Sequence, residues 1–496
     1  KKHNKMAKNG ESSSSSLQEP MSPAAQLFHE PRLNCYIIAV MGSKTCIDPI
    51  TIKEGLHQTL VQHPRFSSKL VAEGKKMKWK RTVVNLEDHI VVPKLDGDDI
   101  EFPADRFVED YISHLTTIPM DLSKPLWELH ILNVKTSDAE SIAVFRIHHS
   151  MGDGASLISL LLACTRKTSD PEALPTVPTQ KRAGSGNKPG GFWWFFLAFW
   201  TVLRMMWNTL VDLVLLGATM LFLKDTTTPL KGTPPSGFHE PKPKKIVYRI
   251  VSLDDIKLMK NAVNMTINDV ITGVVQAGLS RYLNRKYGEN KKYKEGERAN
   301  IVNLPKGIRL RATVLVNLRP AVGIQALADL MAGETTAKWG WGNWIGYILL
   351  PFTIALQDNP LDYLQSAKST ISRKKHSLES IITFQSAMLV LKLFGTKVTA
   401  AILHKVLSNT TLAFSNVVGP VEEISFFGHP IAFLSPTVYG NPQALTIHFQ
   451  SYSNKMIIVL AVDPDVIPDP HILCDDIQES LQTIKDAVLR KGSDAV

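Results

Sequence analysis

The chain has 496 residues and a formal net charge of +10 at pH 7, and 44% of its residues are hydrophobic while 21% are charged. This length exceeds what one hydrophobic core supports, so we expect two domains or two halves of one fold, and the ordinary composition excludes a wholly disordered chain. The positive charge favours anionic partners. Because the sequence has neither a zinc-finger spacing nor an aromatic–basic stacking pattern, we expect a membrane surface or a phosphate-bearing substrate and no nucleic acid.

The start of the chain and its cysteines indicate a reducing compartment. Residues 1–24 are basic and serine-rich without an apolar run, which predicts a disordered tail and no secretory signal. The four cysteines are scattered and form no C-x-x-C pair, so we expect neither a disulfide framework nor a metal site.

Residues 25–166 have the pattern of a mixed α/β half. Short apolar runs typical of strands alternate with segments whose apolar residues recur at helical spacing. Strands are expected at 33–40, 77–84, 88–93, 126–134 and 141–148, and helices at 52–63, at 105–116 and from Asp153 onward.

Residues 167–243 have the composition of a linker, and they contain the most apolar segment of the chain, 192–223. This segment is longer than the roughly twenty residues that cross a bilayer as a helix, and its tryptophans are typical of membrane interfaces. Arg204, Asn208 and Asp212 recur every fourth residue, which places them on one helix face. A single span would separate the two halves of the chain, so we favour an in-plane or hairpin-like insertion over a span or a buried core helix.

Residues 244–496 predict a second α/β half. Strands are expected from 246, at 309–318, at 410–418 and as a hairpin across 443–463, and helices at 266–286, over much of 359–407 and near 470–490.

The residues most suited to chemistry form the heptapeptide HHSMGDG at 148–154. A strand that ends in two histidines and turns into a helix presents those side chains at a sheet edge, where clefts form. A histidine there can accept a proton near neutral pH, and Asp153 can cap the helix that follows. A hydrogen-bonded structural pair of histidines stays open on this reasoning. A metal site is the weaker interpretation, because no third and fourth ligand is evident nearby.

The heptapeptide matches the HHxxxDG motif of the chloramphenicol acetyltransferase-like superfamily, and other segments resemble one branch of it, the plant wax ester synthase/diacylglycerol acyltransferases. These segments are Pro125-Leu126-Trp127 with Glu128, Asn268-Asp269, Val316-Asn317-Leu318-Arg319-Pro320, Gly342-Asn343 and Ser415-Asn416-Val417-Val418-Gly419-Pro420. The DFGWG element of the BAHD branch does not occur in the second half. The resemblance covers about residues 25–490 apart from the apolar segment. It implies an α/β fold of two acetyltransferase-like halves with mixed sheets, flanking helices and an active-site tunnel between the halves.

The resemblance also implies roles for the residues of the motif. His149 is expected to be the general base and His148 to position it. Asp153 is expected to support the site structurally, against an arginine such as Arg319, and Gly154 completes the motif.

Outside the motif, Asn268 and Asp269 are the expected substrate-binding positions, although two such residues at a helix start would equally serve as its cap. The stretch Ser415–Pro420 is expected to shape the tunnel or the interface between the halves, and Trp127 to pack in the core.

The implied reaction is the esterification of a long-chain fatty alcohol, of diacylglycerol or of both, with a long-chain acyl-CoA as the acyl donor and without a cofactor or a metal. We expect the endoplasmic reticulum membrane as the location, with the catalytic halves facing the cytosol, and the plasma membrane as the alternative. A non-catalytic scaffold of the same fold that binds acyl-CoA or lipid is the alternative function.

Overall fold

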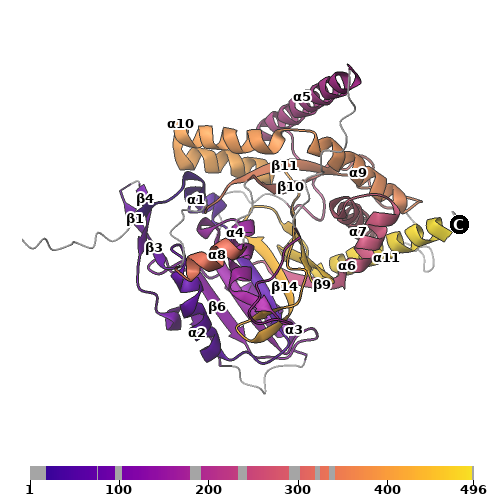
Figure 1. Cartoon of the computed structure of the whole chain (residues 1–496). Coiled ribbons are helices and arrows are strands. Elements are labelled where there is room, and N and C mark those ends of the chain that lie inside the picture. The colour runs from indigo at the N-terminus through magenta and orange to yellow at the C-terminus, as the bar shows by residue number, and fades with distance from the viewer. Residues whose placement is uncertain are drawn as a thin grey trace, which may run out of the picture.

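The computed structural model describes residues 18–74, 76–94, 103–178, 192–232, 243–289, 302–318, 324–333 and 341–493. Within these residues the chain forms two large β-sheets, and helices pack around each of them (Figure 1). The fold is α/β with mixed sheets and flanking helices, as expected.

The first sheet holds the strand that leads to the histidine motif. From edge to edge it runs through β5 (Ile90–Val91), β6 (Trp127–Leu132), β7 (Ser141–His148), β2 (Tyr36–Ser43), β14 (His429–Tyr439), β13 (Ile424–Phe426) and β8 (Thr165–Lys167). All eight residues of β7 are buried, as its continuous apolar run suggests for a central strand. β7 pairs antiparallel with β2, and this pairing sets His148 opposite Tyr36.

The second sheet is built from the second half alone. It runs through β11 (Ile345–Phe352), β10 (Leu310–Asn317), β12 (Leu412–Val417), β15 (Leu445–Tyr452), β16 (Lys455–Val462) and β9 (Lys245–Ser252). One face packs against α7 (Ile267–Glu289) and α11 (Pro470–Ser493) in a continuous hydrophobic core. The other face meets the first sheet, where the rings of Tyr248 on β9 and Phe433 on β14 lie 4.7 Å apart.

Two strands of the second half belong to the first sheet. β14 pairs antiparallel with β2, and β13 pairs with both β14 and β8, so that β14 lies between β2 and β13. Residues 244–496 therefore supply strands to both sheets, and the first sheet is completed only by residues far along the chain.

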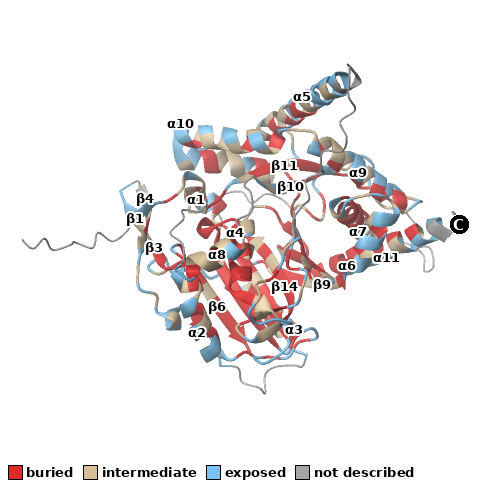
Figure 2. Cartoon of the chain, viewed as in Figure 1, coloured by how far each residue is buried: buried red, intermediate tan, exposed pale blue. Residues whose placement is uncertain are grey.

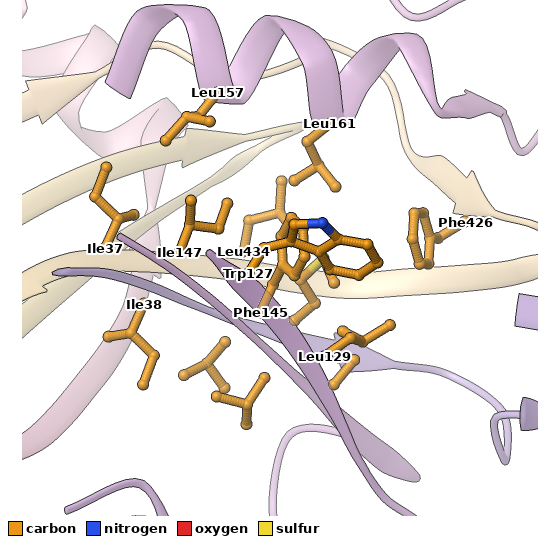
Figure 3. Packing of buried hydrophobic residues seen from close by; sticks show 14 of the residues in the cluster. Ile37, Ile38, Trp127, Leu129, Phe145, Ile147, Leu157, Leu161, Phe426 and Leu434 are labelled. Atoms are coloured by element: carbon orange, nitrogen blue, oxygen red, sulfur yellow. The ribbon is translucent and has the colours of Figure 1, made fainter. Parts of the chain in front are cut away.

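Helices pack around both sheets. The core of the first sheet includes residues of α2 (Pro49–Gln58), α3 (Asp105–Leu115), α4 (Gly154–Ala163) and α8 (Ile324–Met331), whereas α6 (Leu253–Ala262) and α9 (Leu361–Lys375) pack against α7 beside the second sheet. α4 packs on the sheet through Leu157 and Leu161, above Phe145, Ile147 and Trp127 (Figure 3). α8 of the second half packs against α4 of the first. Trp127 is fully buried and donates its indole N–H to the Phe66 carbonyl at 2.9 Å, which makes it the core residue that was expected.

The described part of the N-terminal segment begins at residue 18. Gln18–Pro20 form β1, which pairs with β4 (Lys76–Arg81) in a small sheet that also holds β3 (Ser68–Glu73). α1 (Pro23–Leu27) and the 3-10 turn η1 (Pro31–Leu33) follow. The part of the expected tail from 18 to 24 is thus strand and helix, because its residues find partners in β4; residues 1–17 lie outside the described part of the chain.

Two long apolar helices lie on the outside of the second half, α5 (Phe192–Leu221) and α10 (Glu379–Ser408) (Figures 1 and 2). Both are long and apolar enough, by length and composition, to cross a membrane. α5 is one continuous helix, so the hairpin-like form of insertion is not adopted within this segment.

Candidate active site

The histidine motif lies where β7 ends. His148 is the last residue of the strand, His149–Met151 form the 3-10 turn η5, and α4 begins at Gly154. Both imidazoles are buried, with 2% of His148 and 4% of His149 exposed. The strand thus delivers the two histidines into the interior of the protein rather than to its surface.

His148 uses both of its ring nitrogens. Nδ1 accepts the backbone N–H of Ser150 at 3.2 Å and lies 2.7 Å from its Oγ, so that the proton of the ring is on Nε2, which lies 2.9 Å from Oδ1 of Asn34. Burial lowers the pKa of His148 well below its ordinary value, and the neighbouring His29 and His149 lower it further. A neutral, fully hydrogen-bonded ring suits a positioning role.

His149 is held by its backbone and by one aromatic ring. Its N–H donates to the Cys35 carbonyl at 3.0 Å, and its carbonyl accepts the side-chain amide of Asn343 at 3.1 Å. The ring of Phe28 stacks on the imidazole with centroids 4.2 Å apart, and the buried Nδ1 has no hydrogen-bond partner within the part of the chain that the structure describes. Burial lowers the pKa of His149, although its own carbonyl, the charge of Asp153 and Asn343 oppose the shift. The ring therefore stays neutral, as a proton acceptor must be.

Asp153 is the N-cap of α4. Its Oδ1 accepts the N–H of Ser156 at 2.9 Å, and its Oδ2 accepts the N–H of Trp344 at 3.4 Å. The carboxylate therefore caps the start of the helix and also joins the first half to the second. Gly154, the first residue of α4, is exposed, and a Cβ at this position would meet nothing within 4 Å, so the space beside it is open.

A short loop of the second half, residues 341–344, closes over the motif. The indole N–H of Trp341 donates to the Met151 carbonyl at 2.6 Å, and the ring lies 3.1 Å from where a Cβ on Gly152 would be. Asn343 and Trp344 bind His149 and Asp153 as described above. Gly342 has a φ of 134°, a conformation that favours glycine, which lets the loop turn between the two contacts.

A buried ion pair supports the strand beneath the histidines. Arg146 on β7 is 1% exposed; it pairs with Glu128 at 2.6 Å and donates Nε–H to the hydroxyl of Tyr439 at 2.6 Å. Its guanidinium lies 5.2 Å from the ring centre of Tyr36, whose ring in turn contacts the edge of His148. Glu128, which follows the Pro-Leu-Trp segment, thus holds Arg146 in place and contacts the histidines only through Arg146 and Tyr36.

The two expected substrate-binding residues lie in the first turn of α7 and differ in their contacts. Oδ2 of Asp269 accepts the N–H of Thr266 at 2.8 Å, while the N–H of Asp269 donates to the Thr266 hydroxyl at 3.3 Å, which is a capping box. Asn268 is exposed, and its Oδ1 accepts the amide of Asn416 at 2.7 Å. Among the described residues, neither one forms a hydrogen bond with the histidine motif.

The stretch Ser415–Pro420 carries the chain from one sheet to the other. β12 ends at Val417 in the second sheet, and β13 begins at Ile424 in the first. Gly419 is needed between them, because a Cβ there would lie 2.1 Å from the Ser451 carbonyl. The stretch therefore links the two sheets, while its hydrogen bonds with Asn268, Ser451 and Ser453 stay within the second half, so its place at an interface or tunnel stays a prediction. Arg319, the expected partner of Asp153, lies outside the described residues.

Sequence reasoning missed the N-terminal contribution to the site. Phe28 covers His149, His29 stacks on His148 at 4.4 Å, and Asn34 binds the same ring. No motif marks these residues. The loop 341–344 had a signal, since Gly342-Asn343 stood out in the sequence, but nothing in the pattern showed that it would meet the histidines.

Comparison with known proteins places the whole chain in one family. The wax ester synthase/diacylglycerol acyltransferase catalytic domain matches residues 51–271, and the C-terminal domain of the same family matches residues 341–485. Wax ester synthase/diacylglycerol acyltransferase 5 of Arabidopsis thaliana is 54% identical over 491 residues, which are 96% of this chain and 95% of that protein. Number 11 of the same plant is also 54% identical, over 96% of both chains.

Solved structures share the fold. The wax ester synthase/diacylglycerol acyltransferase from Marinobacter aquaeolei VT8 superposes with a TM-score of 0.59 at 17% identity, over 95% of this chain and 99% of that one. The first condensation domain of the CDA synthetase superposes with a TM-score of 0.54 at 12% identity, over 96% of this chain and 98% of that one. With identities above 50% along almost the full chain of its plant relatives, the protein belongs to the wax ester synthase/diacylglycerol acyltransferase family and is an O-acyltransferase.

Proposed function

We propose that the protein transfers a long acyl chain from coenzyme A to the hydroxyl of a fatty alcohol or of diacylglycerol, with His149 as the general base. His149 takes the hydroxyl proton as the acceptor oxygen attacks the thioester carbon. The new C–O bond replaces the C–S bond, and His149 returns the proton to the departing thiolate. Such proton transfer by a positioned base contributes roughly 10²- to 10⁴-fold to the rate.

The carrying observation is the contrast between the two histidines. Both ring nitrogens of His148 lie within hydrogen-bond distance of groups of the protein. Nδ1 of His149 has no hydrogen-bond partner among the described residues, and the ring of Phe28 stacks on the imidazole. Of the two rings, His149 therefore has a nitrogen that is not committed to the hydrogen bonds that hold the site. Asp153 caps α4 and joins the two halves, which fits structural support.

The acceptor and the location follow from the relatives and the apolar surface. The Arabidopsis proteins are named as wax ester synthases and diacylglycerol acyltransferases. The two acceptors of the proposed reaction, a fatty alcohol and diacylglycerol, both dissolve in membranes. We place the enzyme at the endoplasmic reticulum membrane with both halves in the cytosol. The tunnel is assigned to the interface between residues 25–166 and 244–496, with Asn268 on the acceptor side and Asp269 as the cap of α7.

The test is release of coenzyme A from palmitoyl-CoA by the purified protein, with hexadecanol or dioleoylglycerol as the acceptor. We expect acceptor-dependent release that falls at least 100-fold in His149→Ala. His114→Ala, which removes an exposed histidine of α3, is the matched control and should leave the rate unchanged. Release that survives in His149→Ala refutes the assignment of the base.

A non-catalytic scaffold predicts a different result from the same experiment. It would bind palmitoyl-CoA and release no coenzyme A with either acceptor, and His149→Ala would not alter its behaviour. If the protein is folded and gives this result, the scaffold hypothesis replaces the proposed catalytic function.

A further inference from the structure

The two long apolar helices differ from membrane spans in their shape and their contacts. Length and composition alone would let α5 and α10 cross a bilayer, but the described structure also shows what each helix packs against. Neither arrangement fits a helix that passes from one side of a membrane to the other.

α10 is folded back on itself at Gly395. This residue has a φ of 79° and a ψ of −179°, which breaks the helix into the limbs 379–394 and 396–408. The two limbs run side by side (Figure 1), and Leu391 of the first limb and Ala400 of the second pack into one hydrophobic cluster with Leu27 and Leu33. Each limb is at most about 24 Å long, which is less than the roughly 30 Å of hydrocarbon in a bilayer.

α5 is clamped to the second half by its polar face. Asp212 is fully buried and pairs with Arg373 at 2.8 Å and with Lys374 at 2.9 Å, both at the end of α9. One helical turn earlier, Asn208 donates its amide to the His376 carbonyl at 3.1 Å. From residue 208 onward the helix is therefore part of the protein body.

The first part of α5, residues 195–207, projects from this body (Figure 1). It is about 20 Å long, again too short to cross a bilayer. Its exposed apolar side chains point to all sides of the helix, since successive residues are turned by about 100°. They include Leu197, Phe199, Trp200, Val202, Leu203 and Trp207. A contact with another protein would cover one face of a helix, whereas a lipid phase covers every face.

The exposed face of the α10 hairpin is apolar, like residues 195–207 of α5, and it also carries positive charge. Leu393 and Phe394, next to the turn, are each 63% exposed, and α10 packs against α5 (Figure 2). Between residues 380 and 408 there is no acidic residue, while Lys392, Lys397 and Lys405 are exposed. An apolar surface with basic residues complements an anionic lipid bilayer and repels a second copy of itself.

We propose that the α10 hairpin and residues 195–207 of α5 form a single docking surface that inserts into one leaflet of an anionic bilayer, with neither helix crossing it. This inference rests on the proposed function, because it takes the acceptor to be soluble in lipid. The N-terminal segment links this surface to His149, since Leu27 and Leu33 pack against α10 and Phe28 stacks on the imidazole. In this proposal the acceptor reaches the base from the lipid side, past this segment.

The experiment measures flotation of the purified protein with phosphatidylcholine vesicles that contain or lack phosphatidylserine. Two double variants place charge on the surface: Leu393→Asp with Phe394→Asp, and Trp200→Asp with Trp207→Asp. Ile50→Asp is the matched control, because Ile50 is 67% exposed on α2, at the opposite end of the molecule. We expect each double variant to bind vesicles at least tenfold more weakly than the parent protein, and the control to bind like the parent. Phosphatidylserine should strengthen the binding of all four proteins.

The insertion depth comes from an environment-sensitive fluorophore on Phe394→Cys, quenched by lipids that carry bromine at known depths. Quenching confined to the leaflet that faces the protein supports the proposal, and a fluorophore reached through the opposite leaflet overturns it. Unchanged binding of both double variants, or light scattering that shows a dimer lost in the same variants, also overturns it.

Coenzyme A release from hexanoyl-CoA and hexanol keeps this proposal separate from the proposed function. Both double variants should retain that activity, since both substrates dissolve in water, and its retention also shows that they fold. If the parent protein released no coenzyme A from any substrate, the proposed function would be refuted. The flotation experiment would then test the docking surface alone.

Discussion

The ring of Phe28 lies nearly parallel to the imidazole of His149, with the centroids 4.2 Å apart and the planes inclined by 17°. Phe28 follows α1, in the N-terminal segment that packs against α10, whereas His149 follows β7 near the end of the first half. The contact therefore joins the candidate base to a segment that also touches the apolar exterior. It both buries the imidazole and fixes its orientation.

Phe28→Ala is expected to move the acid side of the pH profile. Burial holds the pKa of His149 below 6.5, so the neutral base persists to lower pH in the parent protein. Removing the stacked ring admits water, the pKa rises toward 6.5, and protonation removes the base at a higher pH. We expect kcat/KM at neutral pH to fall by about 3- to 10-fold, from the loss of an aromatic contact, with the acid limb shifted upward.

Phe28→Tyr is the control for this change, since its ring can stack in the same way. It should keep the acid limb of the parent protein. An acid limb that stays in place in Phe28→Ala would show that other residues bury His149 without Phe28.

Replacing Asp153 should shift the pKa of His149 in the opposite direction. The charge of Asp153 raises the pKa of His149, so Asp153→Asn should lower that pKa further and move the acid limb to lower pH. The amide oxygen of Asn can still cap α4, so the melting temperature should change little, whereas Asp153→Ala should also lose about 1 kcal/mol from the missing cap. The comparison needs pH–rate profiles and thermal melts of both variants. Equal melting temperatures in the two would contradict the capping role.

Glu128 should make the fold sensitive to acid. Burial raises its pKa, but His130 and Arg146 outweigh burial and hold the pKa at about 2 in the folded protein, against 4.5 for an ordinary Glu. Because the folded pKa is depressed, the stabilisation is complete above pH 4.5 and is lost as the pH falls toward 2. The contribution is about 2–3 kcal/mol. Glu128→Gln should flatten the dependence of the free energy of unfolding on pH in this window, measured by urea titration. Glu140→Gln, in an exposed ion pair with Lys135, should leave it unchanged.

Asp212→Ala should loosen α5. The substitution removes the carboxylate that Arg373 and the buried Lys374 both contact. Because Lys374 keeps its pair with Glu379 at 2.6 Å, we expect a cost of about 1–3 kcal/mol, as for a lost hydrogen bond to a charged group. We expect a lower unfolding midpoint in urea and faster proteolysis within residues 192–221, followed by mass spectrometry in detergent. Lys44→Ala breaks an exposed pair with Glu423 and should cost less than about 1 kcal/mol. Proteolysis at the parent rate would mean that apolar contacts alone hold the helix.

Much of the fold follows from local pattern. The run 141–148 is the strand β7 with the expected bounds, and 443–463 is the hairpin of β15 and β16, because a buried strand needs a continuous apolar sequence. The strand β14 was not predicted. Its polar residues Ser435 and Thr437 and its internal proline break the apolar pattern, and its place beside β2 is set by pairing over a long sequence distance.

The site shows the same division. A strand that ends in two histidines before a capped helix could be recognised, because strand, turn and cap are local features. The roles of Phe28 and Asn343 could not, since a ring that stacks and an amide that binds a backbone carbonyl have no sequence signature until the fold brings them together.

The position of β14 between β2 and β13 also sets the order in which the molecule can be completed during its synthesis. Until residues 424–439 have left the ribosome, β2 has an open edge on one side, and β8 has no strand to pair with. An open edge next to the buried β7 is a site for pairing with other nascent chains. The sheet that carries His149 therefore closes late, and a product truncated before residue 424 would aggregate rather than persist as a half-enzyme.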